Sequence, residues 1–314
     1  MSKSEAAVNK ADVLILGAGA AGLMCARTAG QRGRRVVVLD QANKAGKKIL
    51  MSGGGRCNFT NLDVGSEHFL SRNPHFCKSV LSRYTQWDFI SLVSEYGIAW
   101  HEKSDGQLFC DHSSKDILDM LLREIELVGA ELHLKTRVRA VTPGQPDGWL
   151  VTTDSGAWHC QSLVVATGGP SIPTLGASDW GQQFARRLGH ELVPYRPSLV
   201  PYTAHPEEKQ LWSALSGVAL PVTLSVSARH WTGDLLFTHR GLSGPAVLQI
   251  TNYWQPGEPV QIDWWPAGDL LSEWEQQRGI KGRQSWQHWL SDRLPRRVVD
   301  WLLHGRPQST ARLH

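Results

Sequence analysis

The N-terminal part of the chain contains two short apolar runs separated by a stretch with helical spacing. The first run, Asp12 to Leu16, leads into Gly17-Ala18-Gly19-Ala20-Ala21-Gly22, and the second, Val36 to Leu39, ends in Asp40. Short apolar runs bounded by glycine or polar residues are typical of buried strands. The pattern therefore predicts a strand, a glycine-rich turn, a helix and a second strand.

The glycine-rich turn has the G-x-G-x-x-G spacing of a dinucleotide site. Gly17 would permit the tight turn, Gly19 would let the backbone approach a pyrophosphate, and Gly22 would let the helix pack closely on the strand. The partly positive N-terminus of the helix would face the phosphates. Asp40 lies 18 residues beyond Gly22, near the roughly 20-residue offset of a carboxylate that accepts hydrogen bonds from a ribose. We therefore expect a nucleotide without a 2′-phosphate.

A second glycine-rich stretch, Gly46 to Asn61, carries three consecutive glycines among cations, a thiol and amides. One interpretation is a flexible surface loop. The other, which we favour, is a loop whose backbone N–H groups gather with Lys47, Lys48 and Arg56 around an anion. The charge of Arg56 would favour a thiolate at Cys57, but we favour a buried, unreactive cysteine.

The middle of the chain begins with helical patterns. Apolar spacing from Ser79 to Tyr96 predicts a core-facing helix. A hairpin is expected from Ile98 to Asp111, with its turn at Ser104-Asp105-Gly106. The next helix is expected from Lys115 to Val128, with Ser114 as its N-cap.

Strand patterns follow. A β-meander is expected over Glu131 to Val141, Trp149 to Thr153 and Ala157 to Cys160. The apolar run from Leu163 then leads into Ala166-Thr167-Gly168. It predicts a buried parallel strand that opens onto the same crevice as the first glycine turn.

Three long stretches of this sequence resemble the YhiN/BaiN-like family of NAD(P)/FAD-dependent oxidoreductases. They are Lys47 to Asn61, Val165 to Pro173 and Leu236 to Ala246. The resemblance implies an α/β fold with a Rossmann-type FAD-binding domain and a β-meander, together with an inserted β-barrel-like domain and a small helical segment. We expect the FAD-binding domain at residues 1–195, the inserted domain at 196–265, the helical segment at 266–304 and an irregular tail at 305–314.

The motifs and the resemblance together give a set of expected FAD contacts. The set comprises Gly17, Ala18, Gly19, Ala20, Ala21, Gly22, Asp40, Gln41, Lys47, Lys48, Ser52, Gly53, Gly54, Arg56, Cys57, Asn58, Val138, Ala166, Thr167 and Gly168. Val138 is assigned to the adenine side by the resemblance alone. No catalytic residue is assigned, because a bound flavin itself carries the hydride or electrons, and no metal site is expected.

The end of the chain departs from the family pattern. The resemblance implies that, after the inserted domain, the chain returns to the FAD-binding domain through a further segment. This segment would carry a Gly-Glu…Asp…Gly-Gly-Tyr-Asn-type motif that lies against the flavin. No such motif follows Leu303. We therefore expect weak FAD binding and little turnover from the chain as written.

Composition narrows the function classes. The chain has 314 residues, 41% of them hydrophobic, and its five cysteines form no C-x-x-C pair. No apolar run approaches the roughly 20 residues of a membrane span, so we expect a cytoplasmic protein without a membrane partner. Ten of the 14 tryptophans fall from Trp180 onward, which indicates a second domain. Despite a net charge of +4, no run of five cations occurs, and we do not expect nucleic acid as a partner.

The leading interpretation is an FAD-dependent oxidoreductase acting on a small organic substrate, with NAD(P)H or oxygen as the other redox partner. A second G-x-G-x-x-G is absent, so any NAD(P)H would bind transiently at the flavin face. One alternative is a flavin-dependent RNA-modifying protein, and another is a truncated, non-catalytic flavin binder. The RNA alternative is suggested by Arg278, Lys281, Arg283, Arg293, Arg296 and Arg297, interleaved with Trp286 and Trp289. The oligomeric state stays open.

Overall fold

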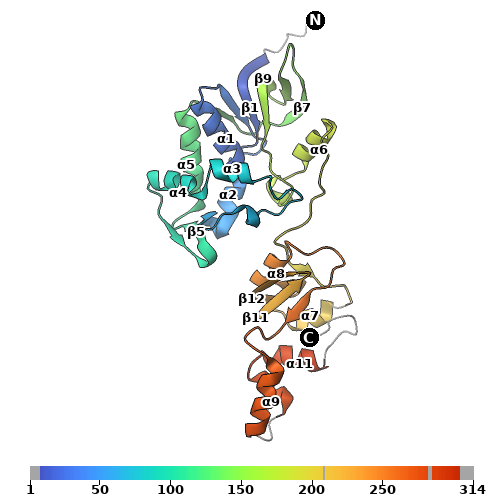
Figure 1. The fold of residues 1–314 in the computed structure, drawn as a ribbon. Coiled ribbons are helices and arrows are strands. Elements are labelled where there is room, and N and C mark those ends of the chain that lie inside the picture. The colour runs from blue at the N-terminus through green and yellow to red at the C-terminus, as the bar shows by residue number, and fades with distance from the viewer. Residues whose placement is uncertain (1–7, 208, 282–284, 305–314) are drawn as a thin grey trace. The chain divides into compact units, whose positions relative to one another are not determined.

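The computed structural model describes residues 8–207, 209–281 and 285–304. It divides into two compact units, Met1–Val193 and Pro194–His314 (Figure 1). Each unit has its own sheet and its own buried core. The two units are described separately below.

The first unit is built on a six-stranded sheet in the order β6-β2-β1-β9-β8-β7. Strands β6, β2, β1 and β9 are parallel, whereas β9, β8 and β7 pair antiparallel. The strands are β1 (Val8–Leu16), β2 (Val36–Leu39), β6 (Glu131–His133), β7 (Val138–Pro143), β8 (Trp149–Thr153) and β9 (Gly156–Val165). Every residue of β2 is buried, as expected of a parallel strand covered on both faces. The predicted α/β class is confirmed.

Helices α1 (Ala20–Gln31) and α5 (Ser114–Leu127) contact each other in this unit (Figure 1). Successive residues of β1 pack in two different buried clusters, because side chains alternate between the two faces of a strand. Ile15 joins one buried cluster with residues of α1 and α5, whereas Leu14 and Leu16 join a cluster that contains Trp158. The Ser113 hydroxyl accepts a hydrogen bond from the Lys115 N–H at 3.1 Å, so Ser113, and not Ser114, is the N-cap of α5.

Two of the predicted strands have different bounds in the structure. The expected strand from Glu131 to Val141 is divided into β6 and β7, with Lys135 between them at a φ of +54°. Conversely, the third meander strand and the strand from Leu163 are one continuous strand, β9. One half of β9 therefore pairs with β8, and nearly its whole length pairs with β1.

The predicted helix from Ser79 to Tyr96 is also wrong in its extent. The structure has α3 (Lys78–Arg83) and α4 (Gln86–Glu95), separated by a capping box in which Thr85 and Asp88 bond reciprocally. The Thr85 hydroxyl accepts a hydrogen bond from the Asp88 N–H, so Thr85 begins a new helix and does not continue the first one. As a result Val80 and Trp87, expected in the core, are 64% and 58% exposed.

The remaining elements of the first unit include a three-stranded sheet in the order β3-β5-β4. Its strands β4 and β5 confirm the predicted hairpin. The elements are α2 (Lys47–Met51), η1 (Ser52–Gly55), β3 (Asn58–Asn61), η2 (Ser66–His68), β4 (Trp100–Glu102), η3 (Ser104–Gly106), β5 (Gln107–Cys110), η4 (Pro173–Leu175) and α6 (Trp180–Arg187).

The second unit contains a five-stranded antiparallel sheet in the order β10-β13-β12-β11-β14. Its elements are β10 (Tyr202–Thr203), α7 (Lys209–Ala214), β11 (Ala219–Val226), β12 (Arg229–Thr238), β13 (Gly241–Ser243), α8 (Pro245–Ile250), β14 (Gln261–Asp263), α9 (Leu270–Lys281), α10 (Trp286–Ser291) and α11 (Arg296–His304). Its core includes Phe237, stacked on Trp264, and the fully buried Trp289. The late tryptophans are therefore largely packing residues. No helix in the described part of the chain is long and apolar enough to span a membrane.

Candidate functional site

A cavity of about 1040 Å³ opens at the carboxyl ends of β1, β2 and β9. Its size is at the upper end of the range for ligand pockets, about 300–1,000 Å³. Thirteen of the expected contacts line it: Gly17, Ala18, Gly19, Ala20, Ala21, Asp40, Gln41, Lys47, Lys48, Val138, Ala166, Thr167 and Gly168. The strand-end position is where open α/β sheets bind ligands.

The three glycines of the first motif have different surroundings. A Cβ on Gly17, whose φ is +111°, would lie 2.4 Å from the carbonyl oxygen of Ala166. A Cβ on Gly22 would lie 1.9 Å from the carbonyl oxygen of Gly17. At Gly19, which lines the cavity, a Cβ would meet no protein atom within 4 Å. Gly17 and Gly22 are thus required by backbone packing, whereas Gly19 leaves space beside the helix N-terminus that a ligand can occupy.

Asp40 joins the glycine turn to the end of β2. Its Oδ2 accepts a hydrogen bond from the Ala18 N–H at 2.7 Å, and its Oδ1 accepts one from the Ala42 N–H at 2.7 Å. An ionised carboxylate has about four lone-pair sites. Asp40 therefore fixes the turn and still has acceptor capacity at the cavity wall.

Lys48 links α2 to the loop that follows β9. Its Nζ donates to the carbonyl oxygen of Gly169 at 3.2 Å and to the Ser171 hydroxyl at 2.9 Å. A Cβ on Gly168 would lie 3.9 Å from the same Nζ. Together with Lys47, this ammonium gives the cavity wall positive charge, which suits a phosphate-containing ligand.

Seven expected contacts do not line the cavity: Gly22, Ser52, Gly53, Gly54, Arg56, Cys57 and Asn58. The second glycine-rich stretch is not an open loop, because it forms α2, η1 and β3. A Cβ on Gly53 would lie 2.7 Å from the Asn58 nitrogen and 2.7 Å from the Phe109 ring, so this glycine permits a tight turn against β5. Gly53 thus has a packing role, whereas a Cβ on Gly54 or Gly55 would meet no protein atom within 4 Å. The contact of this stretch with FAD stays a prediction.

Cys57 is buried, and burial raises the pKa of its thiol despite the hydrogen bond with Ser52. A raised pKa disfavours the thiolate, which is the reactive form. The expected burial of Cys57 is confirmed, and its low reactivity stays a prediction.

Helix α6 also contributes to the cavity, although its residues were not among the expected contacts. Trp180, Gly181 and Gln182 line it, and the Trp180 ring stacks on Phe184 with centroids 5.4 Å apart. The Gln182 Oε1 is buried without a hydrogen-bond partner among the described residues. A buried acceptor without a partner is costly, so this oxygen fits a donor on a bound ligand. The amphipathic spacing of residues 180–187 is a signal for a helix, but it does not indicate that the helix lines a cavity.

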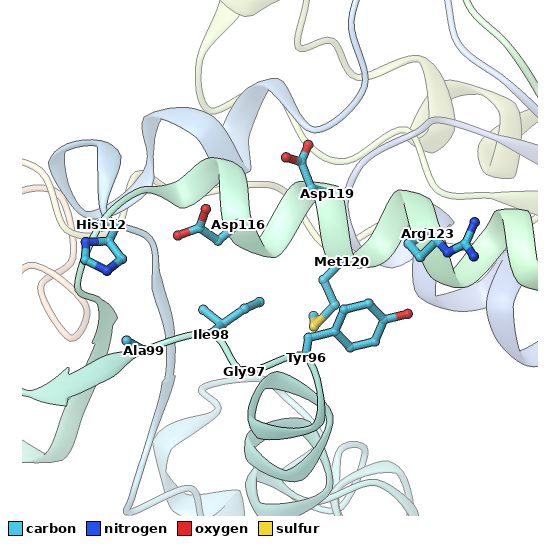
Figure 2. Close-up of a pocket in the computed structure, with 9 residues that line it drawn as sticks. All are labelled: Tyr96, Gly97, Ile98, Ala99, His112, Asp116, Asp119, Met120 and Arg123. Atoms are coloured by element: carbon cyan, nitrogen blue, oxygen red, sulfur yellow. The ribbon is translucent and has the colours of Figure 1, made fainter.

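A second cavity, of about 510 Å³, lies between α5 and the turn after α4 (Figure 2). Met120 and Tyr96 lie close together there (Figure 2). Of its charged groups, Asp119 pairs with Lys115 and Arg123 pairs with Glu126. These groups are already paired within α5, and this cavity shows no buried polar atom that needs a ligand among the described residues.

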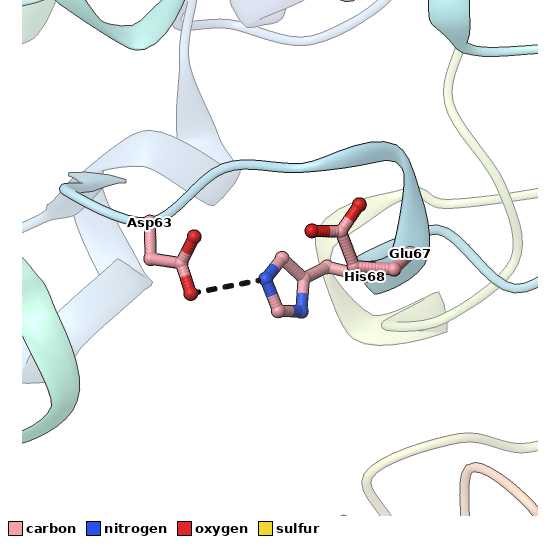
Figure 3. A group of neighbouring side chains, drawn as sticks. All are labelled: Asp63, Glu67 and His68. Carbon is pink, nitrogen blue, oxygen red and sulfur yellow. Dashed lines mark ion pairs between the residues drawn. The ribbon is translucent and has the colours of Figure 1, made fainter.

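Asp63, Glu67 and His68 form a small group near η2 (Figure 3). The His68 Nε2 lies 3.3 Å from the Asp63 Oδ2. All three residues are exposed, and exposed acidic groups of this kind are common without a metal ion. We therefore do not assign a metal to this group.

Comparisons with known proteins agree with the geometry of the large cavity. A family model described as the HI0933-like protein Rossmann domain matches residues 11–268. The chain is similar to the ribosomal RNA dihydrouridine synthase of Escherichia coli, with 49% identity over 292 residues, 93% of this chain and 73% of the relative. It is similar to the Haemophilus influenzae protein of the same name, with 48% identity over 297 residues, 93% of this chain and 74% of the relative. A 3-dehydro-bile acid delta(4,6)-reductase of Clostridium scindens is 28% identical over 246 residues, 76% of this chain and 59% of the relative.

These relatives correct two expectations. The expectation of a small-molecule substrate, with nucleic acid not expected as a partner, is contradicted by two relatives whose names specify ribosomal RNA. The same names favour the RNA-modifying alternative over the leading interpretation. A net charge of +4 without long cationic runs was therefore a poor guide to the partner.

Some of the residues that suggested the RNA alternative are occupied by contacts within the second unit, whereas Arg296 is exposed. The Arg293 guanidinium lies 3.9 Å from the centroid of the buried Trp289 ring, and Arg297 donates to the carbonyl oxygen of Ala214 at 3.2 Å. The Trp286 ring stacks on Trp289. The side chains of Arg278 and Lys281 and the whole of Arg283 lie outside the described residues. Trp286 and Trp289 pack on each other, so the described tryptophans of this set serve the core of the second unit.

Proposed function

The chain belongs to the HI0933-like family of FAD-dependent oxidoreductases, and on that premise we propose that it is a flavin-dependent dihydrouridine synthase acting on ribosomal RNA. One observation carries the proposal. The 49% identity to the Escherichia coli synthase extends over 93% of this chain and includes both units. The chain spans 73% of that relative's length.

The reaction reduces the C5–C6 double bond of a uracil base within RNA. A hydride is added to one carbon and a proton to the other, and the proposed donor NAD(P)H leaves as NAD(P)⁺. Bound FAD supplies the hydride-carrying chemistry, while the protein supplies position and electrostatics. Because the sequence has a single G-x-G-x-x-G motif, we place NAD(P)H transiently at the flavin face.

The large cavity is the proposed FAD site. Gly19 leaves room for the pyrophosphate beside the N-terminus of α1, and Lys47 and Lys48 supply positive charge. Asp40 would accept from a ribose hydroxyl, and Val138 would contact the adenine side. Gln182 would accept a hydrogen bond from the ligand, which satisfies its buried Oε1.

The proposed substrate also constrains access and location. A base inside a duplex is shielded by stacking, so the target uridine must be unpaired or extruded from its stack. Ribosomal RNA is a cytoplasmic substrate in bacteria, and we therefore place the protein in the cytoplasm.

The test is direct. The purified chain, loaded with FAD, is incubated with unmodified ribosomal RNA transcribed in vitro and with NADH or NADPH. Nucleoside mass spectrometry should detect dihydrouridine only when a reduced nicotinamide is present. A Gly19→Val variant, whose side chain would fill the proposed pyrophosphate position, is the matched control. Because little turnover is expected, the reaction is followed over long incubations. A folded, FAD-loaded chain that forms no more dihydrouridine than the reaction without nicotinamide would overturn the proposal.

A further inference from the structure

Residues 69–87, which we call the aromatic-basic segment, expose an unusual amount of apolar surface. Its exposed large apolar residues are Phe69 (47%), Leu70 (53%), Phe76 (76%), Val80 (64%), Tyr84 (38%) and Trp87 (58%). Single exposed apolar residues need no explanation, but six within one short segment indicate a surface used for interaction. This group does not belong to the FAD cavity, because none of its members lines it.

The local backbone explains why these side chains stay outside. Helix α3 ends at Arg83, and Tyr84 is extended, with φ −145° and ψ 103°. The capping box at Thr85 then begins α4 as a separate helix. Val80 and Trp87, seven residues apart, would share one face of an unbroken helix. The break leaves both exposed.

Cations are interleaved with these apolar residues. Arg72, Lys78 and Arg83 are exposed, and no described carboxylate lies within ion-pairing distance of them. No acidic residue occurs within 69–87. Along the chain, the nearest acidic residues are Glu67 before the segment and Asp88 after it, and Asp88 is engaged in the capping box. In space, Glu95 and Glu124 also lie near Tyr84.

This combination matches one class of partner. Proteins that bind single-stranded nucleic acid combine cations that contact phosphates with aromatic side chains on which bases stack. A purely apolar protein partner would not need three unpaired cations in the same segment. A membrane surface would match the charge, but an RNA with unpaired bases matches both the charge and the exposed rings.

We propose that the aromatic-basic segment binds unpaired nucleotides of the RNA substrate, with Arg72, Lys78 and Arg83 contacting phosphates and Phe76 and Trp87 stacking on bases. This inference rests on the proposed function, because it names the surface by which that substrate is held. It also explains RNA recognition without the tryptophans of α10, which are packed in the second unit.

The test measures RNA binding separately from turnover. Fluorescence anisotropy follows a fluorescein-labelled oligouridine of 12 nucleotides, and a 12-base-pair RNA duplex serves as the comparison ligand. The first variant is Arg72→Gln/Lys78→Gln/Arg83→Gln. Each phosphate contact on a single strand contributes about 0.7 to the slope of log K against log salt. The slope should therefore decrease by about 2, with clearly weaker binding.

The second variant is Phe76→Ser/Trp87→Ser. Stacking contributes about 1–3 kcal/mol per base, so oligouridine binding should weaken at least tenfold while duplex binding changes little. Both residues are exposed, so the fold should persist, and circular dichroism checks this. Matched controls are Arg32→Gln/Arg34→Gln/Arg139→Gln for the cations and Trp231→Ser for the aromatics; all four residues are exposed.

The outcomes separate this inference from the proposed function. If the variants bind oligouridine as well as the unaltered chain, or if the controls lose as much affinity, the segment is not the RNA surface. If sedimentation shows that the aromatic change abolishes a dimer and leaves RNA binding intact, the surface serves a second copy and the inference is wrong. Dihydrouridine formation that the variants leave unchanged would overturn the surface and retain the function. Segment-dependent RNA binding without dihydrouridine would support the surface and overturn the function.

Discussion

Gly22 of α1 packs directly against Gly17, and a Cβ on Gly22 would lie 1.9 Å from the Gly17 carbonyl oxygen. This contact fixes the start of the helix beside the end of β1. It explains why two glycines of one motif are needed even before any ligand binds.

Gly22→Ala should therefore destabilise the first unit. The added methyl must displace backbone, and overpacking of this kind costs about 1–3 kcal/mol. Urea unfolding of the FAD-free protein should show a lower midpoint than for the unaltered chain. Gly33→Ala is a poor control because its φ is +73°, whereas Ala20→Gly at the exposed start of α1 changes the same helix without adding volume. An unchanged midpoint for Gly22→Ala would contradict the packing argument.

Gly19→Ala should leave stability nearly unchanged and weaken FAD binding. Its Cβ would meet no protein atom within 4 Å, and its φ of −86° is ordinary for any residue. The free energy of unfolding should stay within about 0.5 kcal/mol of that of the unaltered chain, as is usual for surface substitutions. Flavin absorbance after desalting should nevertheless decrease, and Gly19→Val should bind still less FAD. Full flavin occupancy in both variants would place the pyrophosphate elsewhere.

Asp40→Ala should affect both the fold and the cofactor. It removes acceptors from the N–H groups of Ala18 and Ala42, and hydrogen bonds to charged groups contribute about 1.5–3 kcal/mol each. Thermal unfolding of the FAD-free protein measures the structural part. Titration with FAD measures the ribose part, and Asp40→Asn should retain more stability than Asp40→Ala. A stability loss without any change in FAD affinity would limit Asp40 to its structural role.

Glu124 should make the first unit sensitive to acid. Burial raises the pKa of this carboxyl, but hydrogen bonds from Tyr96 and Arg27 and the charge of Arg27 outweigh it and lower the pKa overall. A lowered pKa stabilises the fold above the unfolded-state value of about 4.3, and this stabilisation is lost as the pH falls through the folded-state value. Stability measured from pH 7 to pH 3 should fall less steeply in Glu124→Gln. At pH 7 that variant should be less stable, since Arg27 loses its charged partner; equal pH profiles would contradict the assignment.

Buried cysteines should resist alkylation in the folded protein. Burial raises the pKa of Cys110 to about 12, with a smaller contribution from nearby Cys57, and raises that of Cys160 to about 11. Iodoacetamide at pH 7.5, followed by peptide mass spectrometry, should leave Cys57, Cys110 and Cys160 unmodified until denaturant is added. Rapid labelling of Cys57 in the native protein would show that its thiol is accessible.

The βαβ unit and its crevice could be predicted from the sequence because their signals are local. Gly17, Gly19 and Asp40 occur at spacings that the backbone itself imposes, and apolar runs such as Val36 to Leu39 require a strand buried on both faces. The position of the β9 carboxyl end at the crevice was predicted in the same way, from the apolar run that leads into Ala166. These parts of the fold needed no knowledge of distant contacts.

The misassigned parts depend on competition that periodicity does not show. Thr85 ends one helix and begins another, although the apolar spacing around it continues. The packing of Gly53 against Asn58 and Phe109 could not be seen in the sequence, because Phe109 lies far along the chain. The role of α6 could not be predicted because the buried, unpaired state of the Gln182 Oε1 results from tertiary packing.

The bonds from Asp40 to Ala18 and Ala42 also bear on the thermodynamics of association. Both bonds are made within the chain, so they fix the turn without a contribution from a ligand. Ordering a loop residue costs about 1–2 kcal/mol of conformational entropy, and here that loss is incurred during folding, not during binding. Preorganisation of this kind raises affinity mainly by removing an ordering cost. The empty turn should consequently show the same amide hydrogen-exchange protection at Ala18 and Ala42 as the occupied one.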